Sequence, residues 1–112
     1  MMKPLVLVVA VAAGVTLALP AAAKGNPENG KAKAAQVCAA CHGADGAKPT
    51  APENPILAGQ HEDYLAKALS DYKSGKRSNA IMKGFAGQLS KQDIADLAAW
   101  FSSQSSPLKT AR

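Results

Sequence analysis

The pattern of hydrophobic and polar positions divides the chain into two parts. Residues 5–19 form an almost uninterrupted apolar run, which follows Lys3 and precedes three alanines at 21–23. A positive start, a short apolar run and small residues at its end are typical of a secretory signal peptide, and the run is shorter than the roughly 20 residues that span a bilayer. We expect residues 1–23 to be a cleaved signal peptide and residues 24–112 to form one small domain. An uncleaved N-terminal anchor is the alternative.

Beyond the apolar run, the hydrophobic positions recur at helical spacing and show no sustained strand-like alternation. The pattern predicts a first helix that begins at Asn26, a good N-cap, and continues to the residue before the first cysteine. A second helix is predicted over residues 62–73. A third begins at Ser90, where Ser90 and Asp93 have the spacing of a capping box. The expected fold class is therefore all-α.

Two segments lack this periodicity and are expected to be irregular. Residues 43–59 contain three glycines and three prolines, and residues 76–87 contain Met82 followed by two glycines. Ordering such loops costs roughly 1–2 kcal/mol per residue in backbone entropy. Short, alanine-rich helices bury too little apolar area to offset this cost in a small domain. The pattern therefore indicates that a bound group fills part of the core.

Composition limits what that group can be. The chain has two cysteines, two histidines and three methionines, and Met82 is the only methionine outside the expected signal peptide. The net charge of the chain is +5, and Lys3 is the only charged residue of the signal peptide, so the domain is moderately basic. The sequence contains no run of arginines with interleaved aromatic residues, so nothing in it indicates nucleic-acid binding. A basic surface favours an acidic protein partner, although a merely soluble basic surface would have the same composition.

The five residues from Cys38 to His42 read C-x-x-C-H, the pattern of c-type haem attachment. Two thiols at this spacing can both form thioethers with one edge of a haem. The adjacent His42 then lies beneath the iron as an axial ligand. We predict haem attachment through Cys38 and Cys41, in agreement with secretion, because such haem is installed in the periplasm.

Three other uses of the two cysteines are weaker. A thioredoxin-like redox pair belongs near a β-α-β pattern, and no strand precedes Cys38. A structural zinc site needs four ligands, and His61 is the only histidine or cysteine outside the motif. A disulfide between Cys38 and Cys41 would close a very small loop and would stabilise the domain little.

The second axial ligand is predicted from the inventory of the domain. Met82 lies in a segment that is expected to be irregular, where a methionine is unusual unless it packs or binds a metal. We predict that His42 and Met82 are the two axial ligands of the iron. His61 is the alternative to Met82, although its acidic neighbours at the start of a helix also suit a solvated histidine.

The sequence resembles the class I c-type cytochromes, especially the small soluble bacterial ones and the single halves of the two-haem bacterial type. The resemblance extends over nearly all of the domain and rests on segments in the family's order: residues 30–32, 38–43, 55–60, 64–65, 75–77 with Met82, and 89–101. It implies a small cytochrome c fold, with about three to four short helices and ordered loops wrapped around one covalently bound haem c. A second C-x-x-C-H is absent, so two haems are not expected unless two chains associate.

The resemblance also implies contacts within the domain. By position, Pro55 supports His42, and Gly30 on the first helix meets Trp100 on the last. Tyr72 or Trp100 packs near the haem. These roles are expectations that the structure can test.

The expected function is a periplasmic electron carrier, which shuttles single electrons between redox partners in a respiratory or photosynthetic chain. A carrier of this kind is not an enzyme, binds no nucleic acid and is a monomer or weak dimer. A haem-binding subunit of a dehydrogenase, or a haem enzyme or sensor with a labile sixth ligand, is the alternative. Five basic residues flank the expected haem edge and are predicted to steer an acidic partner: Lys48, Lys73, Lys76, Arg77 and Lys83.

Overall fold

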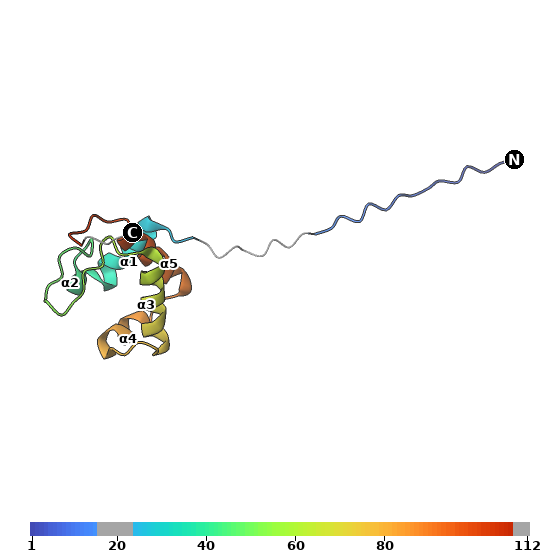
Figure 1. Cartoon of the computed structure of the whole chain (residues 1–112). Helices are drawn as coiled ribbons and strands as arrows, with labels where there is room; N and C mark the ends of the chain where they lie inside the picture. The colour runs from blue at the N-terminus through green and yellow to red at the C-terminus, as the bar shows by residue number, and fades with distance from the viewer. Residues whose placement is uncertain (16–23, 109–112) are drawn as a thin grey trace.

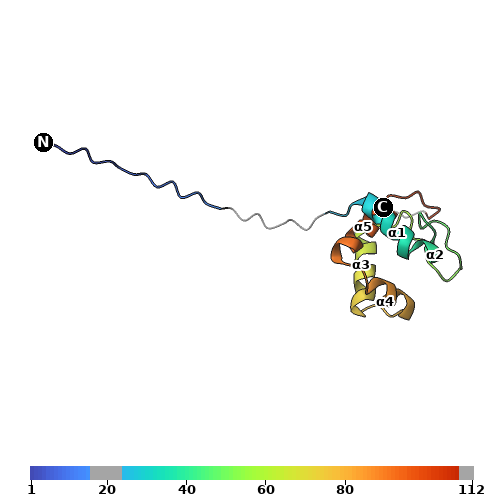
Figure 2. The ribbon, with the colours of Figure 1, turned by 180° about the vertical axis from the view of Figure 1, so that it is seen from behind.

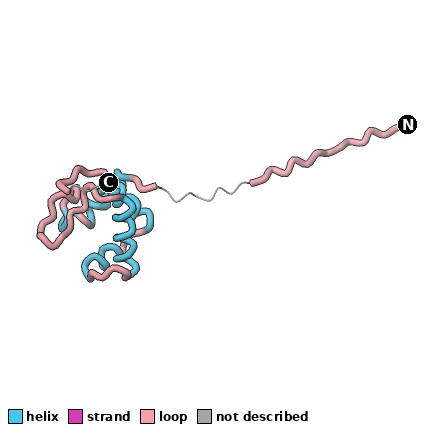
Figure 3. The backbone as a smooth tube through the Cα atoms, viewed as in Figure 1, coloured by secondary structure: helices cyan, strands magenta, loops and turns pink. Residues whose placement is uncertain are grey.

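The computed structural model describes residues 1–15 and 24–108 (Figure 1). Residues 1–15 are exposed and form neither helix nor strand, whereas residues 24–108 contain only helices, turns and loops (Figure 3). The predicted all-α fold is thus confirmed. Within the described residues, no helix is both long and apolar enough to cross a bilayer. The end of the expected signal peptide falls on residues 16–23, which lie outside the described residues.

Five helices occur in the described part of the domain: α1 (Pro27–Val37), α2 (Ala39–His42), α3 (Glu62–Ser74), α4 (Ala80–Ala86) and α5 (Lys91–Ser102). The three predicted helices correspond to α1, α3 and α5. The Asn26 side chain accepts hydrogen bonds from the backbone N–H groups of residues 28 and 29, and so caps α1. Ser90 and Asp93 form the predicted capping box at α5, in which each side chain accepts from the other's backbone N–H.

The expectation that residues 76–87 are irregular is wrong in part, because residues 80–86 form α4. Two glycines at 84 and 87 lower the helical propensity of this segment. The Asn79 side chain compensates as an N-cap, and the fully buried Ala86 packs α4 into the domain beside α3. Met82 therefore lies on a short helix rather than in a loop.

Helices α1 and α5 lie side by side (Figure 2) and make the most extensive helix contact of the domain. Gly30 permits this contact, since a Cβ there would overlap the carbonyl oxygen of Asp96 and lie 2.8 Å from the Cβ of Trp100. The buried carboxylate of Asp96 accepts a 2.7 Å hydrogen bond from the backbone N–H of Asn26, which ties the start of α1 to α5. The predicted contact between Gly30 and Trp100 is confirmed.

The hydrophobic core is small and is built around α5. It consists of the buried residues Ala34, Leu65, Leu89, Ile94, Leu97, Ala98 and Phe101. Leu97 is the only large side chain of the described residues that is fully buried. Such a core agrees with the expectation that a bound group supplies part of the apolar interior.

The segment between α2 and α3 is ordered by hydrogen bonds, although it contains no helix. The backbone N–H of Thr50 donates to the carbonyl of Cys41 at 3.0 Å, and that of Leu57 donates to the carbonyl of Gly46 at 2.9 Å. At its end, the N–H of Gly59 donates to the carbonyl of Phe101 at 2.9 Å. This loop is therefore fixed both to α2 and to the end of α5.

Candidate functional site

A cavity of about 520 Å³ lies inside the domain, bounded by α2 and the following loop, by α3 and α4, and by α5. Most of its wall is apolar: Val37, Pro55, Ile56, Leu57, Leu65, Ala68, Leu69, Ile81, Phe85, Ala86, Leu89, Leu97, Ala98 and Phe101. Cofactor sites typically have volumes of about 300–1,000 Å³ and predominantly apolar walls. The size and lining of this cavity therefore suit a large, mainly apolar group.

The C-x-x-C-H motif contributes three side chains to one wall of the cavity. Cys38 ends α1, and the next turn of chain is α2, in which the N–H of His42 donates to the carbonyl of Cys38 at 3.0 Å. This single turn places the side chains of Cys38, Cys41 and His42 along the same wall. Both thiols are free and half-buried, and the imidazole is buried.

The His42 ring is fixed by a hydrogen bond from Nδ1 to the carbonyl oxygen of Pro55, at 2.9 Å. A carbonyl oxygen can only accept, so Nδ1 carries a proton, and in the neutral imidazole Nε2 then keeps its lone pair. Neutral histidine in this tautomer is a good metal ligand, and the carbonyl fixes the orientation of the ring. The predicted support of His42 by Pro55 is thus present as a specific contact.

The surroundings of the cysteines do not favour the competing uses. Burial raises the pKa of the Cys38 thiol to about 11, whereas reactive redox thiols have lowered pKa values. Cys38 and Cys41 do not form a disulfide. Among the described residues, no group of three or more histidine, cysteine, aspartate or glutamate side chains is arranged to hold a metal ion.

Of the two candidate sixth ligands, only Met82 lines the cavity. Met82 is half-buried and lies on α4, and His42, the predicted first ligand, lies on α2 at the same cavity. His61 is exposed and lies beside a separate, open depression between the start of α3 and α5. The geometry therefore favours Met82, and its bond to iron stays a prediction.

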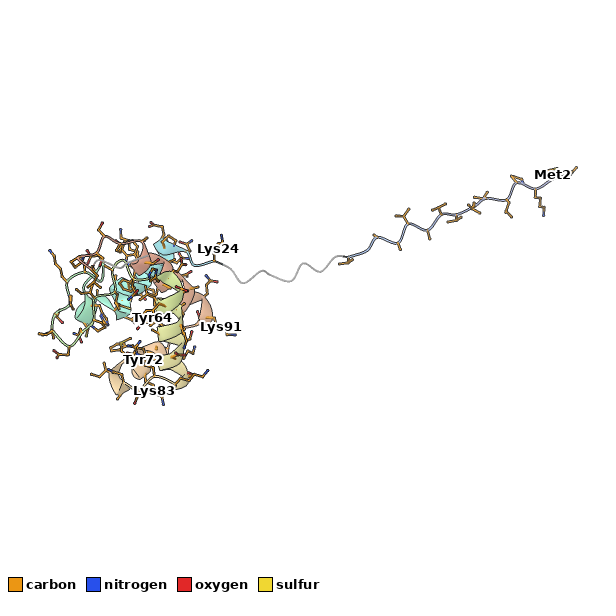
Figure 4. The ribbon with its side chains drawn as sticks, in the orientation of Figure 1. Met2, Lys24, Tyr64, Tyr72, Lys83 and Lys91 are labelled. Atoms are coloured by element: carbon orange, nitrogen blue, oxygen red, sulfur yellow. The ribbon has the colours of Figure 1, made fainter. Side chains whose placement is uncertain are left out.

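Three further residues of the cavity wall form one group. The guanidinium of Arg77 lies 4.8 Å from the centre of the Tyr72 ring, and its Nη1 lies 3.4 Å from the hydroxyl of Tyr64. All three residues line the cavity, and Figure 4 shows both tyrosines on the same face of α3. Tyr64 was not expected at the site, although its spacing of eight residues from Tyr72 places the two on one helix face.

Trp100 does not line the cavity, so of the two aromatic residues expected near the haem only Tyr72 does. The indole N–H of Trp100 donates to the carbonyl of Ala44 at 3.3 Å, and the Lys31 ammonium lies 5.6 Å from the ring centre. Trp100 therefore joins α5 to α1 and to the start of the loop. Asn79, which caps α4 and also lines the cavity, was not identified from the sequence.

Comparison with known proteins agrees with this geometry. The cytochrome c family model matches residues 27–105. Cytochrome c4 of Pseudomonas aeruginosa is 56% identical over 82 residues, which cover 73% of this chain and 40% of that protein. The thiosulfate dehydrogenase electron acceptor of Stutzerimonas stutzeri is 40% identical over 80 residues, which cover 71% of this chain and 37% of that protein.

The fold is also found in a solved structure. The crystal structure of reduced recombinant cytochrome c4 from Pseudomonas stutzeri has a TM-score of 0.68 and 43% sequence identity, and the match covers 79% of this chain and 50% of that one. The present chain thus spans about two fifths to half the length of these relatives. It corresponds to a single cytochrome domain.

The chain belongs to the cytochrome c family, as its sequence predicts. The cofactor of this family is a covalently bound haem c with its iron. The site fits this group, because two thiols on one helical turn lie next to an imidazole with a free Nε2 at the wall of a large apolar cavity. The predicted haem c is thus confirmed at the level of the family.

Proposed function

We propose that this protein is an electron carrier with one haem c. Cys38 and Cys41 would hold the haem through thioether bonds, and His42 and Met82 would bind its iron. The observation that carries this proposal is the 2.9 Å hydrogen bond from His42 Nδ1 to the Pro55 carbonyl, since it leaves Nε2 available to a metal. The cytochrome c4 relatives support the same function.

The haem, when bound, supplies exchange of a single electron between the ferrous and ferric states of its iron. The protein residues set the potential of that exchange. Histidine and methionine ligation raises the reduction potential, and the Pro55 carbonyl adjusts the donor strength of the imidazole. Apolar side chains such as Leu65, Leu97 and Phe101 limit the access of water to the cavity.

A carrier rather than an enzyme is proposed because two protein side chains are available to bind the iron. His42 and Met82 belong to different elements, α2 and α4, and line the same cavity. Binding by both residues would leave the iron no position for a substrate. A haem enzyme or sensor would need Met82 to leave the iron readily, and the experiment below distinguishes these cases.

The proposed location is the periplasm, where the carrier would work in a respiratory or photosynthetic chain. Residues 1–23 would act as a cleaved signal peptide and residues 24–112 would be the mature cytochrome domain. The apolar run after Lys3 and the alanines at 21–23 support this division. Protein exported to the periplasm would then have the mass of residues 24–112 plus one haem.

Redox proteins with acidic docking surfaces are the proposed partners. Exposed basic side chains occur at the end of α3 and on α4, including Lys76, Arg77 and Lys83, and Arg77 lies at the cavity itself. Complementary charge of this kind mainly raises association rates. The name of the Stutzerimonas stutzeri relative, an electron acceptor of a dehydrogenase, supports a redox enzyme as one class of donor.

A visible spectrum and an intact mass, both measured on the exported protein, test the proposal. We expect the mass of one covalent haem, a low-spin spectrum, and a far-red band from a methionine-to-iron bond in the ferric protein. Met82→Ala should remove this band, whereas His61→Ala should keep it. A high-spin wild-type spectrum that shifts on addition of carbon monoxide would contradict the carrier and support the enzyme or sensor.

A further inference from the structure

The short helix α4 carries Met82, and its first turn is held by one side chain. Asn79 Oδ1 accepts hydrogen bonds from the backbone N–H of Met82 at 3.0 Å and from that of Ile81 at 3.1 Å. We propose that Asn79 is a positioning residue for the sixth ligand, since its bond to the Met82 backbone keeps Met82 at the cavity. This inference rests on the proposed role of Met82 as an axial ligand.

Helix α4 depends on this cap because it is short. It has seven residues, fewer than two full turns, and helices of this length are not stable by themselves. The first backbone N–H groups of a helix have no acceptor within the helix. In α4, the side chain of Asn79 is the acceptor for two of these groups. The loss of that partner should therefore shift the equilibrium toward an unwound form of the turn that contains Met82.

Apart from its contact with α3, the remainder of α4 has little to stabilise it. Ala86 is its one buried residue. Gly84 lies in its interior, and no atom lies within 4 Å of the position where a Cβ would be added. Glycine in a helix interior is less favourable than alanine. The balance between a formed and an unwound α4 is thus sensitive both to the cap at Asn79 and to the residue at position 84.

This balance determines how often the iron loses Met82. If the sixth position is free only when Met82 has left, an added ligand binds with an apparent dissociation constant that is inversely proportional to the population of that open state. Removal of an asparagine cap typically changes a helix equilibrium by about fivefold. Loss of the Asn79 cap should therefore raise the open population by about the same factor.

The experiment uses imidazole as the added ligand on the ferric holoprotein, with binding followed by visible absorption. Asn79→Ala should lower the apparent dissociation constant for imidazole by about fivefold. Asn79→Ser, which restores a capping oxygen, should return it toward the wild-type value. Gly84→Ala should change it in the opposite direction to Asn79→Ala, because alanine favours the formed helix.

Asn26→Ala is the matched control, since Asn26 caps α1 in the same way and makes no contact with Met82. It should lower the thermal stability of the holoprotein while the imidazole constant stays unchanged. An equal change in Asn26→Ala and Asn79→Ala would overturn the positioning role, because it would show an effect of global stability. The positioning role would also be overturned if the wild-type protein has the far-red band and Asn79→Ala leaves the imidazole dissociation constant unchanged. Absence of that band from the wild type would instead refute Met82 ligation itself.

Discussion

Gly30 on α1 and the carbonyl oxygen of Asp96 on α5 approach each other so closely that a Cβ on Gly30 would overlap that oxygen. The oxygen belongs to a helix backbone and cannot rotate away, so Gly30→Ala should force the two helices apart. We expect a loss of about 1–3 kcal/mol in the free energy of unfolding, measured by denaturant titration of the holoprotein. Gly84→Ala, where the space is open, is the control and should be neutral or slightly stabilising. Equal stabilities for the two variants would contradict the close contact.

Arg77 places a positive charge at the cavity wall, stacked on Tyr72. A nearby cation favours the ferrous over the ferric state, so Arg77→Gln should lower the reduction potential. The guanidinium is exposed, and solvent limits the expected effect to the order of tens of millivolts. Arg77→Lys keeps the charge and should stay closer to the wild-type value in a potentiometric titration. A potential that falls equally in both variants would assign the effect to the stacking geometry instead.

Asp93 should contribute to stability in a pH-dependent way. The pKa of its carboxyl group is lowered from the ordinary value of 3.8, chiefly by the hydrogen bond from the backbone N–H of Ser90 and to a smaller degree by Lys33. A lowered pKa in the folded state stabilises the protein above pH 3.8, and this contribution is lost as the pH falls through the folded pKa. Asp93→Asn should therefore lower the free energy of unfolding by about 0.5 kcal/mol near neutral pH and by less in acid. Denaturant unfolding between neutral pH and strong acid measures this, and a pH-independent difference would contradict it.

The basic side chains on α4 and before it should influence reaction with charged redox reagents. We expect oxidation by an anionic reagent such as hexacyanoferrate to slow several-fold with rising salt, because screening weakens the attraction at ionic strengths near 0.1 M. Lys76→Glu with Lys83→Glu should reduce or reverse this dependence. The control is Lys24→Glu with Lys91→Glu, which makes the same change in net charge beside the starts of α1 and α5 (Figure 4). This control should retain more of the salt dependence. An identical response of the two double variants would show that only net charge matters.

Local signals made much of this fold predictable. Asn26, Ser90 and Asp93 lie within a few residues of the helix starts that they cap, so the sequence pattern contains the interaction itself. The motif from Cys38 to His42 is also local, since one turn of chain brings its side chains together. The spacing of residues along the chain is enough to predict such features.

The missed features depend on distant or opposing effects. Helix α4 was missed because the glycines at 84 and 87 outweigh a seven-residue pattern, while the cap at Asn79 and the burial of Ala86 become evident only once the chain folds. The support of His42 by the carbonyl of Pro55, thirteen residues away, was predicted only through the resemblance to the family. The position of Trp100 outside the cavity depends on Ala44, at a separation of 56 residues. Spacing alone contains none of these contacts.

The bond from the Asn26 backbone to the Asp96 carboxylate joins residues separated by 70 positions. Helix α5 is the last helix of the described chain, and it supplies Leu97 and Phe101 to both the core and the cavity wall. Contacts of such long sequence separation slow folding, because a long loop must close before they form. The wall of the cavity is complete only when α5 is packed against α1 and α3. A change that loosens the contact between α1 and α5 should therefore also open one wall of the haem cavity.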